Sequence, residues 1–176
     1  PGDIILTTGI HGLSKLGFLI QNKINFDNEF SLNERLIIKS IEHFCRPRVY
    51  PNFLNNLLKT RSNKNIRRIG CTDSSDGLFQ ALQDLAIASN CKAIINYEKI
   101  PKDKDWPKGD KWDEYYFFGG EDYELVFSLP KKWAENLSKL DKNINKIGFF
   151  TDGEPSIEFK DYKKNKLFNN TPFKHF

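Results

Sequence analysis

The chain has 176 residues, a length that fits one domain with a core of its own. Hydrophobic residues make up 39% and charged residues 28% of the chain, which is typical of a globular protein and excludes an intrinsically disordered one. The sequence has no apolar run near the roughly 20 residues of a membrane span and no basic-then-apolar signal segment, so no membrane partner is predicted.

The net charge of +4 comes from the C-terminal end, where residues 160–176 carry five lysines and one aspartate. A solvated lysine-rich end is favoured over a nucleic-acid contact, because aromatic and basic residues do not interleave along a predicted face. The three cysteines are odd in number and form no C-x-x-C pair, so neither a disulfide framework nor a zinc site is predicted. A reducing cytoplasm is the simplest setting.

Apolar periodicity predicts short strands and helices in the first half of the chain. Ser31 and Glu34 form a capping box ahead of an apolar face, and Pro51 suits the start of a further helix. In chain order, we predict a strand over residues 4–8, a helix within 9–24, a helix from Ser31 that ends before Pro47, a short helix after Pro51, a strand over 69–73 and an amphipathic helix over 78–89.

The second half mixes the two element types without a strict alternation, which indicates an α+β fold. Residues 101–113 are rich in charge, proline and glycine and are predicted to form a surface loop. The YYFF stretch at 115–118 fits a helix or a strand equally. Residues 123–128 alternate apolar and polar side chains, as a half-buried strand does. The other predictions are a strand over 92–100, a helix from Pro130 through Leu140, and two strands around a turn at Asp152-Gly153.

Two aspartates and two serines crowd the stretch CTDSSDGL, residues 71–78, where a predicted strand gives way to a helix. Carboxylates of Asp73 and Asp76 at this point could hold Mg²⁺, a cation that takes oxygen ligands. The alternative is that Ser75 or Asp76 caps the helix, which would contribute about 1 kcal/mol. Capping does not explain the second aspartate, whose repulsion from the first is unfavourable without a cation. Spacing alone leaves both interpretations open.

A second acidic stretch, FFGGEDYELVF, places Glu121 and Asp122 after a Gly-Gly pair and before a predicted strand. The glycines permit backbone shapes that other residues avoid. One interpretation is a polar turn between two apolar elements. The other is a carboxylate held at a strand end, where it can contact a ligand.

Two further features carry weaker signals. The stretch TTGIHG, residues 7–12, is similar to an anion-binding loop but lacks the Walker pattern. His11, His43 and His175 have no second histidine or cysteine at ligand spacing. We therefore predict that these histidines are structural or exposed.

Together, SSDGL and GGEDYEL resemble the C-terminal domain of the thiamine-monophosphate kinase family. Its superfamily includes aminoimidazole ribonucleotide synthetase, selenophosphate synthetase and a hydrogenase-maturation protein. The stretches PGDIILTTGIHG, CRPRVYP, ASNCKAIINYEKIP and FKHF are also similar to the family, so the resemblance runs over residues 1–176. It implies a single α+β domain whose mixed, mainly antiparallel sheet is covered by helices. It also implies that the family's N-terminal ATP-binding domain is absent from this chain.

The family transfers the γ-phosphoryl group of ATP to thiamine monophosphate and gives thiamine diphosphate. Carried over to this sequence, Asp73 and Asp76 would be Mg²⁺ ligands, and Ser75 would contact the nucleotide phosphates. Glu121 would hold the thiamine moiety. A further substrate contact near the C-terminus falls on Asn170, with Phe168 as its alternative.

The resemblance also implies a cytoplasmic homodimer for the whole protein. Because most of the family's metal-binding aspartates belong to the N-terminal domain, we predict that the isolated chain has no kinase activity. Two alternatives stay open: another ATP-dependent enzyme of the superfamily that acts on a different substrate, and a non-catalytic binding module.

Overall fold

The computed structural model describes residues 1–24, 32–48, 50–63, 65 and 68–160 of the chain. In these residues the elements follow the order β1 (Ile4–Thr8), α1 (Leu13–Gln21), α2 (Glu34–Cys45), α3 (Phe53–Thr60), β2 (Gly70–Asp73), α4 (Leu78–Ser89), β3 (Lys92–Ile95), the 3₁₀ helix η1 (Tyr97–Lys99), α5 (Asp110–Phe118), β4 (Leu125–Leu129), α6 (Lys131–Leu140), β5 (Ile144–Thr151) and β6 (Ser156–Phe159). None of the helices described is long and apolar enough to span a bilayer.

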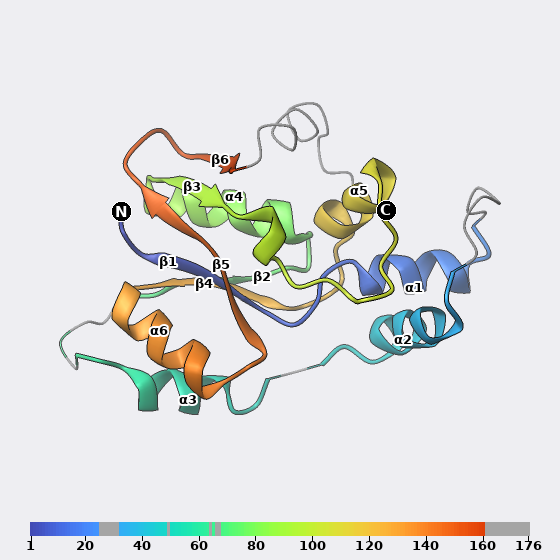
Figure 1. Cartoon of the computed structure of the whole chain (residues 1–176), viewed down its shortest axis with the longest axis horizontal. Coiled ribbons are helices and arrows are strands. Elements are labelled where there is room, and N and C mark those ends of the chain that lie inside the picture. The colour runs from blue at the N-terminus through green and yellow to red at the C-terminus, as the bar shows by residue number, and fades with distance from the viewer. Residues whose placement is uncertain (25–31, 49, 64, 66–67, 161–176) are drawn as a thin grey trace.

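Six strands form one sheet in the order β2-β4-β1-β5-β3-β6 (Figure 1). All neighbouring strands run antiparallel except β3 and β6, which run parallel. This arrangement confirms the predicted α+β fold with a mixed, mainly antiparallel sheet. The two strands predicted around Asp152-Gly153 exist as β5 and β6, but they do not pair as a hairpin because β3 lies between them.

Helices cover both faces of the sheet. On one face, α1, α4 and α5 enclose the larger hydrophobic core; on the other, α3 and α6 enclose a smaller one around Trp133. Figure 1 shows α3 beside α6, and α1 beside α2 at the opposite end of the molecule. The indole N–H of Trp133 donates to the carbonyl oxygen of Leu57 (2.9 Å), which joins α6 to α3.

Strand β4 is buried on both faces of the sheet, which the alternation of residues 123–128 did not predict. Strand β4 lies between β1 and β2, and its residues Val126, Phe127, Ser128 and Leu129 are all buried. The polar side chain of Glu124, which the alternation places outward, is 2% exposed. The prediction of a half-buried strand is therefore wrong, although the strand itself is present.

Several helix starts differ from the prediction. Helix α2 begins at Glu34 with Asn33 at its N-cap, where the Asn33 side chain accepts a hydrogen bond from the N–H of Arg35 (2.8 Å). The predicted capping box is therefore wrong, and its Ser31 lies outside the described residues. Pro51 precedes the N-cap of α3, and the strand predicted over 92–100 ends at Ile95, where η1 follows.

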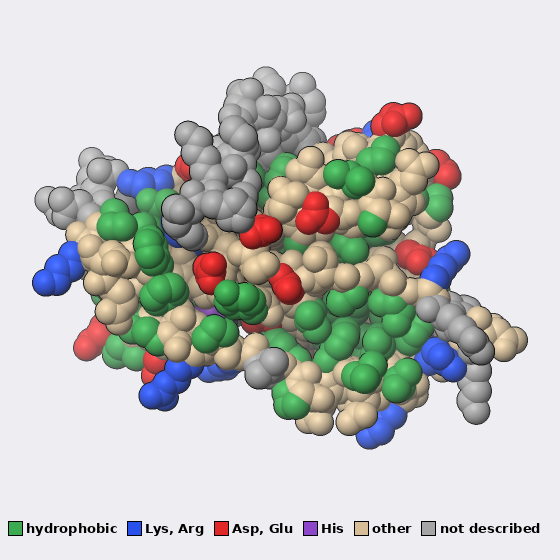
Figure 2. Space-filling model, turned by 180° about the vertical axis from the view of Figure 1, so that it is seen from behind, with side chains coloured by type: hydrophobic (Ala, Val, Ile, Leu, Met, Phe, Trp, Pro, Cys, Tyr) green, Lys and Arg blue, Asp and Glu red, His purple; other side chains and the backbone are tan. Residues whose placement is uncertain are grey.

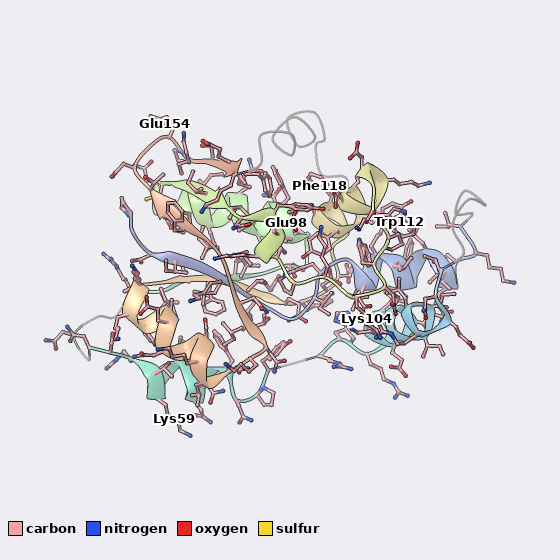
Figure 3. All side chains as sticks on the ribbon, viewed as in Figure 1. Lys59, Glu98, Lys104, Trp112, Phe118 and Glu154 are labelled. Carbon is pink, nitrogen blue, oxygen red and sulfur yellow. The ribbon has the colours of Figure 1, made fainter. Side chains whose placement is uncertain are left out.

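The surface loop predicted over 101–113 is present only in part, because residues 101–109 lie outside helices and strands while residues 110–113 belong to α5, and the segment is not wholly at the surface. Trp106 and Trp112 are buried, and their rings meet edge to face at 5.9 Å between centroids. Trp112 belongs to α5, which begins at Asp110 and takes up the ambiguous YYFF stretch (Figure 3). Buried Asp103 is held by Lys39 at 2.6 Å and by the guanidinium of Arg35. Cationic partners from α2 thus allow this charged segment to pack inward.

Candidate active site

The two acidic stretches of the sequence are joined in the structure. The N–H of Glu121 donates to the carbonyl oxygen of Ser75 (2.8 Å). Ser74 donates its N–H to the carbonyl oxygen of Glu124 (2.9 Å), and its hydroxyl accepts the N–H of Glu124 (3.1 Å). A Cβ on Gly120, which has φ +69°, would lie 2.6 Å from the Ser75 oxygen. The glycine therefore permits the close approach of the two loops.

This junction brings several carboxylates to one surface. Asp73, Asp76 and Glu121 are exposed, and Figure 2 shows acidic side chains gathered across the middle of the face behind Figure 1. The Tyr123 hydroxyl donates to Oε2 of Glu121 (2.7 Å). That hydrogen bond is the main cause that raises the pKa of Tyr123, and the charge of Asp73 adds to it. Residues of both loops therefore act on one another electrostatically.

The helix-capping interpretation of the first loop fails. Helix α4 begins at Leu78 with Gly77 at its N-cap, so neither Ser75 nor Asp76 occupies that position. The Oδ1 atom of Asp73 instead accepts the N–H (3.0 Å) and the hydroxyl (2.6 Å) of Ser75. Asp73 thus shapes the loop, while its Oδ2 atom makes no hydrogen bond within the described part of the chain.

Asp73 and Asp76 fit a metal site that substrate phosphates complete, rather than one formed by protein ligands alone. Within the described residues, no group of three or more His, Cys, Asp or Glu could hold a metal ion. Mg²⁺, however, is commonly bound through one or two protein carboxylates together with substrate phosphates. Two exposed carboxylates at a strand-to-helix turn match that pattern.

The loop TTGIHG does hold an anion, and the anion belongs to the protein. Asp122 is 2% exposed, and its carboxylate accepts the N–H groups of Gly12 (2.5 Å) and Ser14 (2.9 Å) at the start of α1. Burial raises the pKa of Asp122 to about 6, and the two N–H groups oppose that shift. Asp122 of the second acidic stretch therefore holds the N-terminal end of α1 in place.

The histidines His11 and His43 are structural, as predicted, but they are not isolated. The Nε2 atom of His11 lies 2.7 Å from the Thr7 hydroxyl, and burial lowers the pKa of His11 to about 4. His43 is buried between Asp122 and Glu124, 3.7 Å from an oxygen of each. His43 is far from Asp122 and Glu124 in the sequence, so no local pattern could reveal this second set of contacts.

The structure therefore brings together four of the predicted site residues: Asp73, Ser75, Asp76 and Glu121. The remaining predicted contact, Asn170, lies outside the described residues, as do its alternative Phe168 and the third histidine, His175. Sequence reasoning missed Glu124 as a site-forming residue. Its only signal was its place in the GGEDYEL stretch, and the strand alternation hid it.

Residues 1–160 match the family described as AIR synthase related protein, C-terminal domain. The chain belongs to this family. Its curated relatives include the thiamine-monophosphate kinase of Prochlorococcus marinus, 33% identical over the whole chain and over 53% of that relative. Another is the thiamine-monophosphate kinase of Synechococcus elongatus, 29% identical over 99% of the chain and 52% of the relative. These matches confirm the resemblance to the thiamine-monophosphate kinases.

A solved structure of AaThiL complexed with AMPPCP and TMP has the same fold. It is 25% identical, its TM-score is 0.69, and the match covers 99% of this chain and 52% of that one. This AIR synthase related domain thus spans about half the length of the relatives that it matches. Any activity that needs the other half belongs to a longer protein.

Proposed function

We propose that the whole protein containing this domain transfers the γ-phosphoryl group of ATP to thiamine monophosphate and releases thiamine diphosphate. The thiamine-monophosphate kinases among its relatives support this function, as does the AaThiL complex with a nucleotide analogue and TMP. The observation that carries the proposal is the hydrogen bond from Glu121 N–H to the Ser75 oxygen. This hydrogen bond joins the two loops to which the proposal assigns the phosphates and the thiamine.

The first loop serves the phosphate side. Asp73 and Asp76 would hold Mg²⁺, which when bound neutralises charge on the phosphates of the two substrates. Asp73 offers Oδ2 to the cation because its hydrogen bonds to Ser75 use Oδ1. Those hydrogen bonds also hold the Ser75 N–H and hydroxyl close to the carboxylate. In the proposal, Ser75 lies beside the cation and would contact the nucleotide phosphates there.

The second loop serves the thiamine side. The Tyr123 hydroxyl fixes Oε2 of Glu121, which leaves Oε1 of this exposed carboxylate for the ligand. A carboxylate suits thiamine because the ligand carries an aminopyrimidine donor and a cationic thiazolium. Both Glu121 and Tyr123 have positive φ values, 61° and 53°. Such strained backbone is found where the surrounding structure holds functional groups in place.

The rest of the site lies outside this domain in the proposal. Asn170 would add a thiamine contact, and an N-terminal ATP-binding domain would supply further metal ligands. The isolated chain would therefore be inactive, and the whole protein would work as a homodimer in the cytoplasm.

Binding of thiamine monophosphate tests the role of Glu121 directly. Titration calorimetry of the full-length protein should show at least a tenfold weaker Kd for Glu121→Gln, about 1.4 kcal/mol or more of lost binding energy. The matched control is Glu154→Gln, an exposed glutamate on the loop between β5 and β6 (Figure 3). It should bind as the wild type does. Equal affinity for all three proteins would remove Glu121 from the thiamine site.

A further inference from the structure

A cavity lies beside the candidate site, between α2, the start of α1 and the start of β4. Its volume is about 430 Å³, within the range of small-molecule pockets. None of the predicted site residues lines it. Its walls are formed by Gly9, Ile10, Leu13, Lys39, Glu42, His43, Arg46, Arg48, Tyr50, Glu124 and Asn143.

The floor of this cavity is a buried carboxylate with spare acceptor capacity. Oε2 of Glu124 accepts a hydrogen bond from the Thr8 hydroxyl (2.6 Å). Among the described residues, Oε1 has only longer contacts, 3.5 Å to the Tyr50 hydroxyl and 3.7 Å to Nε2 of His43. Ordinary hydrogen bonds to oxygen are about 2.7–3.2 Å long. A buried carboxylate oxygen without a close donor favours a ligand that brings an N–H or a positive charge.

Gly9 keeps this oxygen accessible. A Cβ at Gly9 would lie 1.9 Å from Oε1 of Glu124, so any side chain there would displace the carboxylate. Gly9 has φ +52°, a conformation that few side chains adopt. Gly9 thus makes room for the Glu124 carboxylate.

The exposed part of the lining carries two arginines, Arg46 and Arg48, beside one glutamate, Glu42. Arg46 and Arg48 are exposed, and among the described residues no ion pair or hydrogen bond engages their guanidinium groups. The third cation of the lining, Lys39, is already paired with Asp103 at 2.6 Å. Two unengaged guanidinium groups at a cavity mouth suit a phosphate, to which arginine donates in a bidentate fashion.

We propose that this cavity binds a small zwitterion that carries a protonated amine and a phosphate monoester. The amine would donate to Oε1 of Glu124 at the floor, and the phosphate would lie against Arg46 and Arg48 at the mouth. Glu124 also exchanges backbone hydrogen bonds with Ser74, the neighbour of Ser75. A ligand here would therefore contact the strand end that carries the candidate active site. This site goes beyond the proposed function and does not depend on it.

O-phosphoethanolamine is a probe that carries both the amine and the phosphate. Ethanolamine carries the amine alone, and inorganic phosphate supplies the phosphate alone. Titrated at pH 7 into the full-length protein, the zwitterion should bind at least tenfold more tightly than either half. Arg48→Gln and Glu124→Gln should each weaken its binding at least tenfold. Arg68→Gln is the matched control, because this arginine pairs with Asp3 (3.0 Å) at another surface. Glu121→Gln should also bind normally, since Glu121 does not line the cavity.

Three results would overturn the proposal. The first is that inorganic phosphate binds as tightly as the zwitterion, which would indicate a general anion patch. The second is unchanged affinity in Arg48→Gln, and the third is an equal loss in Glu121→Gln. Because Glu124 is buried, the thermal unfolding of Glu124→Gln is measured first; if this variant does not fold, exposed Arg48 decides the test alone.

Discussion

The backbone N–H of Glu121 donates a hydrogen bond of 2.8 Å to the carbonyl oxygen of Ser75, and this contact joins two loops from distant parts of the sequence. Each loop ends or begins a strand, and the two strands β2 and β4 are neighbours that pair Asp73 with Leu125. The sheet register therefore determines that SSDG and GGED meet. The proposed function depends on this meeting more than on any single carboxylate.

Gly120 tests the importance of the junction. In Gly120→Ala, the new Cβ would lie 2.6 Å from the Ser75 oxygen, so the two loops must separate. Gly109→Ala is the control, because Gly109 also has a positive φ but its Cβ would meet nothing closer than 3.9 Å. Both variants lose about 1–3 kcal/mol of stability through backbone strain. Only Gly120→Ala should also lower the kinase activity of the full-length protein, by tenfold or more. Equal activities would contradict the account.

Asp122 and His11 give opposite pH dependences in one window. The pKa of Asp122 is raised to about 6 in the folded chain by burial, so its contribution to stability is full below about pH 4 and is lost as the pH rises through 6. The pKa of His11 is lowered to about 4, also by burial. Its contribution is full above about pH 6.5 and is lost as the pH falls through 4.

The two contributions therefore oppose each other between about pH 4 and 6.5. Asp122→Asn removes the first, so its Tm should rise more steeply with pH than that of the wild type. His11→Gln removes the second, so its Tm should rise less steeply or fall. Thermal unfolding at pH 4.5, 5.5 and 6.5 measures all three slopes. Parallel profiles for the three proteins would show that neither group titrates in this window.

Asp103 and Asp105 form a matched pair around one arginine. Both carboxylates contact the Arg35 guanidinium, but the Asp103 side chain is 2% exposed and that of Asp105 is 22% exposed. Loss of the charge at Asp103 leaves Lys39 and Arg35 without their buried partner, but both cations are partly exposed to solvent, so Asp103→Asn should destabilise the chain by about 1–2 kcal/mol. Asp105→Asn should cost under about 1 kcal/mol. Urea unfolding measures both, and a larger loss for Asp105→Asn would reverse this ranking.

Local periodicity was sufficient to predict the elements that are either buried throughout or apolar on one face. The strand over 4–8 and the helix over 78–89 have the predicted bounds, because a run of buried residues and a single apolar face each carry a clear pattern. The candidate site was also within reach, since its acidic residues lie in two short stretches. What the stretches could not show is which loop touches which, because strand order is decided by pairing across the whole sheet.

The failures share a different cause. Residues 101–113 look solvated, but Lys39 and Arg35 from α2 neutralise Asp103 and let Trp106 pack inward. Glu124 looks outward-facing, but the Thr8 hydroxyl and the space above Gly9 accommodate it inside. In each case the compensating partner lies far away in the sequence. Patterns within one segment cannot report such partners.

Formation of thiamine diphosphate by the full-length protein tests the central claim most directly. With ATP, thiamine monophosphate and Mg²⁺, the wild type should form product, and Asp76→Ala should lower the rate by a hundredfold or more. Asp152→Ala, an exposed aspartate on the β5–β6 loop, should leave the rate unchanged. A wild type that hydrolyses ATP but never phosphorylates thiamine monophosphate would contradict the account, and would assign the domain to another reaction of its superfamily.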